Sequence, residues 1–297
     1  MAARIGDQAR QKDDTIMANI LITGTSSGFG YLTALEFARK GDRVFATMRN
    51  LDKAGPLKEA AAAEKLPITV SRLDLLDEAS ITSAIAQAEA DAGPLDVLVN
   101  NAGMELRSSI EDASEEEIRK QFETNVFGTV RAIKAVLPGM RERRAGTIVN
   151  LSSIGGIVSV PYGGYYAATK HALEAITEAM HYELSPFGVR VISIQPGAFP
   201  TDFGSNAFSA AKFNDASPYH TGAQNFEKAF DSGIRAPGGA RQDPADVAHT
   251  IYNAVHDETP KLRYTVGADA AMIAAVRKQL DFEAFETAMR NTLNWHD

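Results

Sequence analysis

The chain of 297 residues is long enough for one large domain or two smaller ones, and its 44% hydrophobic and 23% charged residues are typical of a globular protein rather than a disordered or fibrous one. It contains no cysteine, which excludes disulfides, thiolate nucleophiles, zinc–thiolate sites and iron–sulfur clusters. Its net charge of -8 opposes binding to phosphate backbones and anionic lipids, so we expect no nucleic acid and no membrane as a partner.

The N-terminal segment differs in composition from the rest of the chain. Its first 16 residues are polar and lack the apolar stretch of a secretory signal peptide. An apolar run of residues begins almost directly after Met17. We therefore interpret residues 1–17 as a disordered extension, residues 18–297 as a single domain, and the protein as cytoplasmic.

Beyond this extension, short β-branched runs alternate with longer segments of helical periodicity, a pattern typical of repeated βαβ units. Most of the runs are apolar without alternation, as in parallel strands that helices cover on both faces. We predict an α/β fold with a doubly wound parallel sheet, the Rossmann fold, followed by C-terminal helices. The predicted strands are residues 18–23, 43–48, 68–73, 96–101, 146–152, 189–195 and 263–267.

One stretch, residues 145–169, carries no charged side chain and is long enough to be tested as a membrane-spanning helix. Its five glycines, its proline and its hydroxyl residues interrupt the apolar runs with turns. The stretch is better interpreted as a buried segment of a globular domain.

A glycine-rich sequence, TGTSSGFG, follows the first predicted strand and precedes a helical pattern. Gly24, Gly28 and Gly30 permit a tight turn, and the helix would present backbone N–H groups and the positive end of its dipole to a pyrophosphate. The spacing is one residue longer than that of the dinucleotide fingerprint G-x-G-x-x-G. A connection without a ligand is the alternative, but the strand before the turn and the helix after it favour a dinucleotide site.

The second predicted strand ends at Met48, next to Arg49, where Rossmann folds meet the adenosine ribose. An acid there would accept hydrogen bonds from the ribose, but Asp42 lies at the opposite end of the strand. An arginine would instead pair with a 2′-phosphate. Arg49 therefore favours NADP(H) over NAD(H), and an ordinary surface arginine is the alternative.

Tyr166 and Lys170 stand four residues apart in a segment of helical periodicity, so their side chains can share one face of a helix. A nearby ammonium favours the phenolate, and we expect Lys170 to lower the pKa of Tyr166 below its ordinary value of about 10. Tyr166 could then exchange a proton with a carbonyl or alcohol oxygen. A tyrosine and a lysine four residues apart are also common in helices where neither side chain has a catalytic role. Tyr165 has no such partner, because Thr169 stands four residues after it.

Further motifs follow one another in a fixed order. They are NNAG at residues 100–103, Asn125 in NVFG, the pair Ser152 and Ser153, YAATK and PGAFPT. Together with the glycine-rich turn, this order resembles the short-chain dehydrogenase/reductase family over nearly the whole chain after Met17. The stretch from NNAG to PGAFPT is most similar to members related to the 17β-hydroxysteroid dehydrogenases.

The resemblance implies a catalytic set of four residues. Tyr166 would be the general acid/base, and Lys170 would lower its pKa and hold the nicotinamide ribose. Ser153, thirteen residues before Tyr166, would hydrogen-bond the substrate oxygen, with Ser152 as the adjacent alternative. Asn125 would hold a water that connects Lys170 to solvent.

The resemblance also implies which residues contact the cofactor. Asp74, with Leu75 beside it, would meet the adenine, and Thr201 would bind the carboxamide. Phe29 departs from the smaller aliphatic residue that is usual there, but only its backbone N–H is needed. The implied set is Gly24, Ser26, Ser27, Gly28, Phe29, Gly30, Arg49, Asp74, Leu75, Asn101, Ala102, Gly103, Tyr166, Lys170, Pro196, Gly197, Phe199 and Thr201.

The segment from Phe199 to Phe230 interrupts the alternation of strands and helices. No strand is predicted in it, and it holds six of the 14 phenylalanines of the chain. We interpret residues 199–240 as an apolar lid over the site. A small satellite core or a subunit interface is the alternative interpretation.

These features predict an enzyme that transfers a hydride between a nicotinamide cofactor and a ketone, aldehyde or secondary alcohol, with NADPH-dependent reduction of an apolar carbonyl compound favoured. The alternatives are an NAD-preferring alcohol dehydrogenase and a non-catalytic dinucleotide-sensing module, which would not need Tyr166. The histidines have no zinc spacing, so we expect no metal site. The family further implies a homodimer or homotetramer.

Overall fold

The computed structural model describes residues 17–204, 207–235 and 242–295. The predicted extension therefore lies outside the described residues, except for the exposed Met17. Within the predicted lid, residues 205–206 and 236–241 also lie outside them.

The described chain contains a seven-stranded sheet in the order β3-β2-β1-β4-β6-β7-β9, and all of its neighbouring strands are parallel. All seven predicted strands are present, and the α/β, Rossmann-type prediction is confirmed. The central strands are almost fully buried because helices cover both of their faces. The strands are β1 (Asn19–Thr23), β2 (Arg43–Met48), β3 (Ile68–Arg72), β4 (Val97–Asn100), β6 (Gly146–Leu151), β7 (Val189–Pro196) and β9 (Arg263–Val266).

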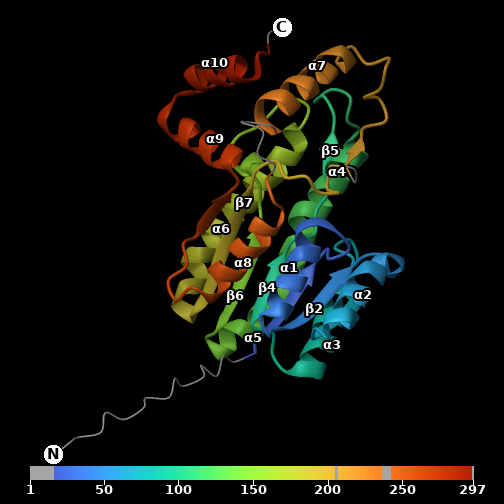
Figure 1. Cartoon of the computed structure of the whole chain (residues 1–297), viewed down its shortest axis with the longest axis vertical. Helices are drawn as coiled ribbons and strands as arrows, with labels where there is room; N and C mark the ends of the chain where they lie inside the picture. Colours follow the sequence, from blue (N-terminus) through green and yellow to red (C-terminus); the bar gives the residue numbers. More distant parts are fainter. Residues whose placement is uncertain (1–16, 205–206, 236–241, 296–297) are drawn as a thin grey trace, which may run out of the picture.

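The helices form two layers around this sheet (Figure 1). On one face α1, α2 and α8 pack around Phe37, Leu57 and Ile251. On the other, α3, α5 and α6 pack around Ile133 and Met180. These helices are α1 (Gly28–Arg39), α2 (Gly55–Glu64), α3 (Glu78–Ala92), α5 (Thr129–Arg143), α6 (Gly164–Leu184) and α8 (Ala245–His256).

The strand order places β2 and β3 on one side of β1 and β4, β6, β7 and β9 on the other, so the direction in which strands are added reverses between β3 and β4. Ligands of such sheets bind outside the carboxyl ends of the strands at this switch point. The predicted site motifs come to that edge: Gly24 follows β1, Arg49 follows β2, Asp74 follows β3, Asn101 follows β4, Ser153 follows β6 and Gly197 follows β7.

The segment after β7 corrects one prediction. A short strand, β8 (Phe208–Ser209), pairs in parallel with β5 (Leu106–Arg107), so the prediction of a segment without a strand is wrong. The two strands are only two residues long, and their pairing partner is distant in the sequence, which leaves no local signal. α4 (Glu115–Phe122) lies beside this small sheet in Figure 1.

A third hydrophobic core joins the C-terminal helices to this region. Phe226, Ile273 and Phe285 meet in it, and Trp295 packs edge-on against Phe226 with ring centroids 5.4 Å apart. Figure 1 shows these helices together at one end of the molecule. They are α7 (His220–Phe230), α9 (Ala268–Gln279) and α10 (Phe282–Leu293). Among the helices that the structure describes, none is long and apolar enough to cross a membrane.

Candidate active site

A cavity of about 1150 Å³ lies at the carboxyl ends of the strands. Its lining joins the glycine-rich turn, the Tyr166 and Lys170 pair, and the aromatic segment after β7. Nearly every predicted site residue borders it. Two do not: Gly30 is buried in the turn, and Asn125 is buried behind the cavity wall.

The glycine-rich turn is too tight for larger residues. Gly24 has φ +74°, and a Cβ there would lie 2.8 Å from Cα of Ala102. A Cβ on Gly30 would lie 2.3 Å from Nδ2 of Asn101, which donates hydrogen bonds to the carbonyls of Thr23 and Gly24. The turn thus brings its backbone to the cavity at the start of α1, and this geometry fits a dinucleotide pyrophosphate.

The part of the cavity next to the end of β2 contains a cationic side chain that sequence reasoning missed. Arg49 is exposed after β2, as predicted, and Asn50 and the exposed Lys53 line the cavity with it. The side chain of Asn50 accepts from the backbone N–H of Asp52 and so begins the 3₁₀ turn that carries Lys53. The sequence does show Lys53 four residues after Arg49, and this short spacing could have indicated a second cation near the end of β2.

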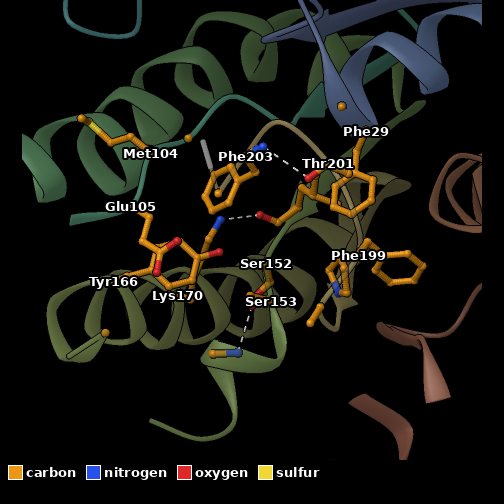
Figure 2. A pocket seen from close by; sticks show the side chains of 18 of the residues that line it. Phe29, Met104, Glu105, Ser152, Ser153, Tyr166, Lys170, Phe199, Thr201 and Phe203 are labelled. Atoms are coloured by element: carbon orange, nitrogen blue, oxygen red, sulfur yellow. Dashed lines mark hydrogen bonds between the residues drawn. The ribbon is translucent and has the colours of Figure 1, made fainter. Parts of the chain in front are cut away.

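Tyr166 and Lys170 share the cavity-facing side of α6, and the ammonium of Lys170 lies 5.6 Å from the centre of the Tyr166 ring. Nζ of Lys170 donates to the carbonyl of Leu151 at 2.7 Å. Burial lowers the pKa of Lys170 to about 8, although the carboxylate of Glu174 raises it. Figure 2 shows both side chains in the cavity.

The expectation that Lys170 lowers the pKa of Tyr166 is corrected by these surroundings. Burial raises the pKa of the Tyr166 phenol well above its ordinary value, and the negative charge of Glu105 raises it further. A hydrogen bond with Ser153 lowers the pKa by more than Glu105 raises it, but burial outweighs this hydrogen bond. The phenol of the cofactor-free protein therefore holds its proton at neutral pH.

Ser153, not Ser152, is the serine next to Tyr166. Its hydroxyl oxygen accepts from the N–H of Gly155 at 3.0 Å and also hydrogen-bonds with Tyr166. Ser152 is buried, and its hydroxyl lies where a Cβ on Gly156 would be only 2.8 Å away. The catalytic roles predicted for these side chains stay predictions, but the geometry permits them.

Asn125 lies in a π-helical turn, Glu123–Gly128, between α4 and α5. Its side-chain oxygen accepts from the N–H of Met104 at 2.9 Å, and its amide donates to the carbonyl of Met104 at 2.9 Å and to Thr169 at 3.1 Å. This amide thus fixes the chain that follows NNAG. The predicted water between Asn125 and Lys170 stays a prediction.

A buried acid holds the loop that begins with Pro196 and Gly197. The N–H of Ala198 donates to the carboxylate of Asp269 at 2.7 Å, and the amide of Gln242 donates to the same carboxylate at 2.8 Å. A Cβ on Gly197 would lie 2.1 Å from this carboxylate, so the contact requires glycine. Sequence reasoning missed Asp269 and Gln242, which come from segments far along the chain.

Phenylalanines of the aromatic segment line the cavity and also belong to the third core, and the lid stays a prediction. Five of the six phenylalanines line the cavity, and Phe203 lies 5.8 Å from the ring of Tyr166. Phe226 lines the cavity and also belongs to the third core. Phe208 does not line the cavity; its ring lies under the ammonium of Lys120. No cluster of three metal-binding side chains occurs within the described ranges of the chain.

Comparisons with known proteins agree with this geometry. The family model described as short chain dehydrogenase matches residues 18–212. YusZ, an uncharacterized oxidoreductase of Bacillus subtilis, is 37% identical over 278 residues, which are 92% of this chain and 97% of that protein. Human 17-beta-hydroxysteroid dehydrogenase type 1 is 34% identical over 252 residues, which are 82% of this chain and 76% of that protein.

Solved structures resemble the fold over most of its length. A short-chain dehydrogenase from Streptomyces avermitilis has a TM-score of 0.77 and 34% identity, with 93% of this chain and 98% of that chain covered. An actinorhodin polyketide ketoreductase solved with NADPH has a TM-score of 0.73 and 27% identity, with 84% and 95% covered. The chain belongs to the short-chain dehydrogenase/reductase family, as predicted, and is an NAD(P)-dependent oxidoreductase that acts on alcohol or carbonyl groups.

Proposed function

We propose that this protein uses NADPH to reduce an apolar ketone or aldehyde. The observation that carries the proposal is the position of Tyr166 where the two parts of the cavity meet. On one side lies the glycine-rich turn, and on the other lie aromatic side chains such as Phe203. A carbonyl group at this place would have a protonated phenol beside it and an apolar wall around its substituents.

The nicotinamide, when bound, supplies the hydride for the carbonyl carbon. Tyr166 donates its proton to the carbonyl oxygen, and Ser153 hydrogen-bonds the same oxygen as negative charge develops on it. The phenol of Tyr166 is protonated at neutral pH, as the proton donor in a reduction must be, and burial raises its pKa further. The Lys170 ammonium would hold the ribose hydroxyls of a bound cofactor and would favour the phenolate that remains after proton transfer.

The preference for NADPH rests on the residues after β2. Arg49 and Lys53 are both exposed and both line the cavity after β2, and two cations there would attract a 2′-phosphate. Asp74, the acid in that part of the cavity, follows β3 and would face the adenine instead. The NADPH held by the related ketoreductase is consistent with this choice.

Two measurements test the proposal. In the first, nicotinamide fluorescence reports the binding of NADPH and NADH to the purified protein, and we expect NADPH to bind at least tenfold more tightly. Equal or tighter binding of NADH would contradict the cofactor preference.

In the second measurement, NADPH consumption is followed over ketones and aldehydes from small aliphatic to steroid-sized molecules. We expect kcat/KM to rise with apolar size. Tight NADPH binding without turnover of any of these compounds would overturn the proposed reaction and favour the dinucleotide-sensing alternative.

A further inference from the structure

A buried carboxylate lines the cavity beside the loop that follows β7. Asp269 is 2% exposed, and its two oxygens accept from the N–H of Ala198 at 2.7 Å and from the side-chain amide of Gln242 at 2.8 Å, as those of an ionised carboxylate do. Both donors are neutral amides. In the described part of the chain, no lysine, arginine or histidine lies within ion-pair distance of Asp269. The carboxylate therefore has hydrogen bonds but no cation to neutralise its charge.

The start of α9 offsets only part of this charge. Asp269 lies in the first turn of that helix, where a carboxylate complements the helix dipole. The dipole supplies about half an elementary charge, so a net negative charge remains beside the cavity. Gln242 fixes its place, because it accepts from the N–H of Ala268 at 2.9 Å and donates to the carbonyl of Ala198 at 3.0 Å.

Crowded and apolar surroundings keep water away from the carboxylate. A Cβ on Gly267 would lie 2.7 Å from Oδ1 of Asp269 and 3.1 Å from the ring of Phe199, so the two side chains pack on either side of this glycine. Phe199 in turn packs edge-on against Phe29, with ring centroids 5.6 Å apart. The field of a charge that water screens so little reaches farther than the field of a surface carboxylate.

The loop that Asp269 holds is the one predicted to contact the nicotinamide end of the cofactor. Phe199 and Thr201 belong to this loop, and both line the cavity together with Asp269. Figure 2 shows Phe199 and Thr201 on one side of the cavity and Tyr166 on the other. Loss of a hydride turns a neutral nicotinamide ring into a cation. A fixed negative charge near the ring therefore stabilises the oxidised form more than the reduced form.

We propose that the charge of Asp269 stabilises the oxidised dinucleotide relative to the reduced one, and so assists the departure of the hydride from NADPH. Asp269 acts through its field, without contact to the reacting atoms. Lys170, the cation on the Tyr166 side of the cavity, has an effect of opposite sign on the ring. The inference rests on the proposed function for the place of the nicotinamide, and it holds for any carbonyl substrate.

The test is the ratio of the Kd of NADP⁺ to the Kd of NADPH, measured by calorimetric titration without a substrate. Asp269→Asn keeps the shape of the side chain and removes its charge, and we expect the ratio to rise about threefold to thirtyfold. Gln242→Met is the matched control, because it removes hydrogen bonds from the same loop and leaves the carboxylate. It should weaken the binding of both forms to the same degree.

The outcomes separate this inference from the proposed function. A ratio that Asp269→Asn leaves unchanged would overturn the inference, even where both forms bind more weakly, and would leave the proposed function intact. Binding of neither form to the unaltered protein would refute the NADPH preference of the proposed function. The same ratio is then measured with NAD⁺ and NADH, and it decides the inference in the same way.

A second measurement needs no altered protein. The benzamide C-nucleoside analogue of NADP⁺ has a flat ring of the same shape without the positive charge. We expect the unaltered protein to bind NADP⁺ about threefold to thirtyfold more tightly than this analogue. Equal or tighter binding of the analogue would overturn the inference, including the case in which Asp269→Asn does not fold.

Discussion

The two ends of the cavity are built in different ways. The cofactor end consists of short turns directly after parallel strands, and its demands are met by single residues such as Gly24 and Arg49. The substrate end is assembled from segments that are far apart in the chain, such as β5, β8 and α7. A tight turn leaves little choice of residue at each of its positions. A wall built from distant segments tolerates a substitution at one position without a change at the others.

The difference teaches where specificity resides in this molecule. Helix α6 carries Tyr166 to the cavity, at the boundary between the two ends, so the proposed chemistry depends on neither end alone. Under the proposed function, the cofactor end would decide which dinucleotide binds, and the substrate end would decide which carbonyl compound reaches the phenol. Substitution of Tyr166 should therefore lower turnover. Substitutions at the cofactor end should affect the binding of the dinucleotide alone, and substitutions at the substrate end should affect the binding of the substrate alone.

The largest effect is expected at the boundary. Tyr166→Phe removes the proton donor and should lower kcat by about a hundredfold to ten-thousandfold while the Kd for NADPH stays within a few-fold. Steady-state kinetics and fluorescence titration measure the two quantities. Tyr165→Phe is the matched control, because the Tyr165 hydroxyl bonds the carbonyl of Ile110 instead. Substantial turnover by Tyr166→Phe would refute the acid/base assignment.

The next effect is on stability rather than rate. Because burial lowers the pKa of Lys170 to about 8 from 10.5, the folded protein loses this proton before the unfolded chain does. Stability of the cofactor-free protein should therefore rise by about 2 kcal/mol between pH 8 and 10 relative to Lys170→Met. Above that range the raised pKa of Tyr166 acts in the opposite direction.

Urea unfolding at several pH values measures this rise. Lys134→Met, at an exposed position on α5, should follow the unaltered protein. Parallel pH profiles for Lys170→Met and the unaltered protein would show that Lys170 is not the titrating group.

At the cofactor end, Arg49→Ala should weaken NADPH binding by about tenfold to a hundredfold, the usual value of a charged hydrogen-bonded contact, and leave NADH binding nearly unchanged. Fluorescence titration with both dinucleotides measures the change. Arg43→Ala, at the opposite end of β2, serves as the control. An equal loss for both dinucleotides would mean that Arg49 does not recognise the 2′-phosphate.

The smallest effect is expected at the substrate end. Phe203→Leu should raise KM for large apolar ketones by about threefold to tenfold, because it removes ring contacts beside Tyr166, and should leave the Kd for NADPH unchanged. Phe208→Leu, outside the cavity lining, should change neither quantity. Equal effects of the two substitutions on KM would contradict the assignment of the aromatic wall.

The sequence by itself determined the parts of this protein that depend on neighbouring residues. Apolar runs define the seven parallel strands, glycines define the tight turn after β1, and a spacing of four places Tyr166 and Lys170 on one helix face. The order of these motifs was sufficient to predict the family.

Only the tertiary structure decided which segments that are distant in the sequence contact one another. It paired β5 with β8, placed Asp269 under a loop 71 residues before it, and grouped Glu105 with Glu227 around Arg107. It also reversed the expected pKa shift of Tyr166, because burial raises the pKa of the phenol more than the hydrogen bond with Ser153 lowers it. The physical reason is that burial and electrostatic fields sum over everything nearby in space, which local spacing does not record.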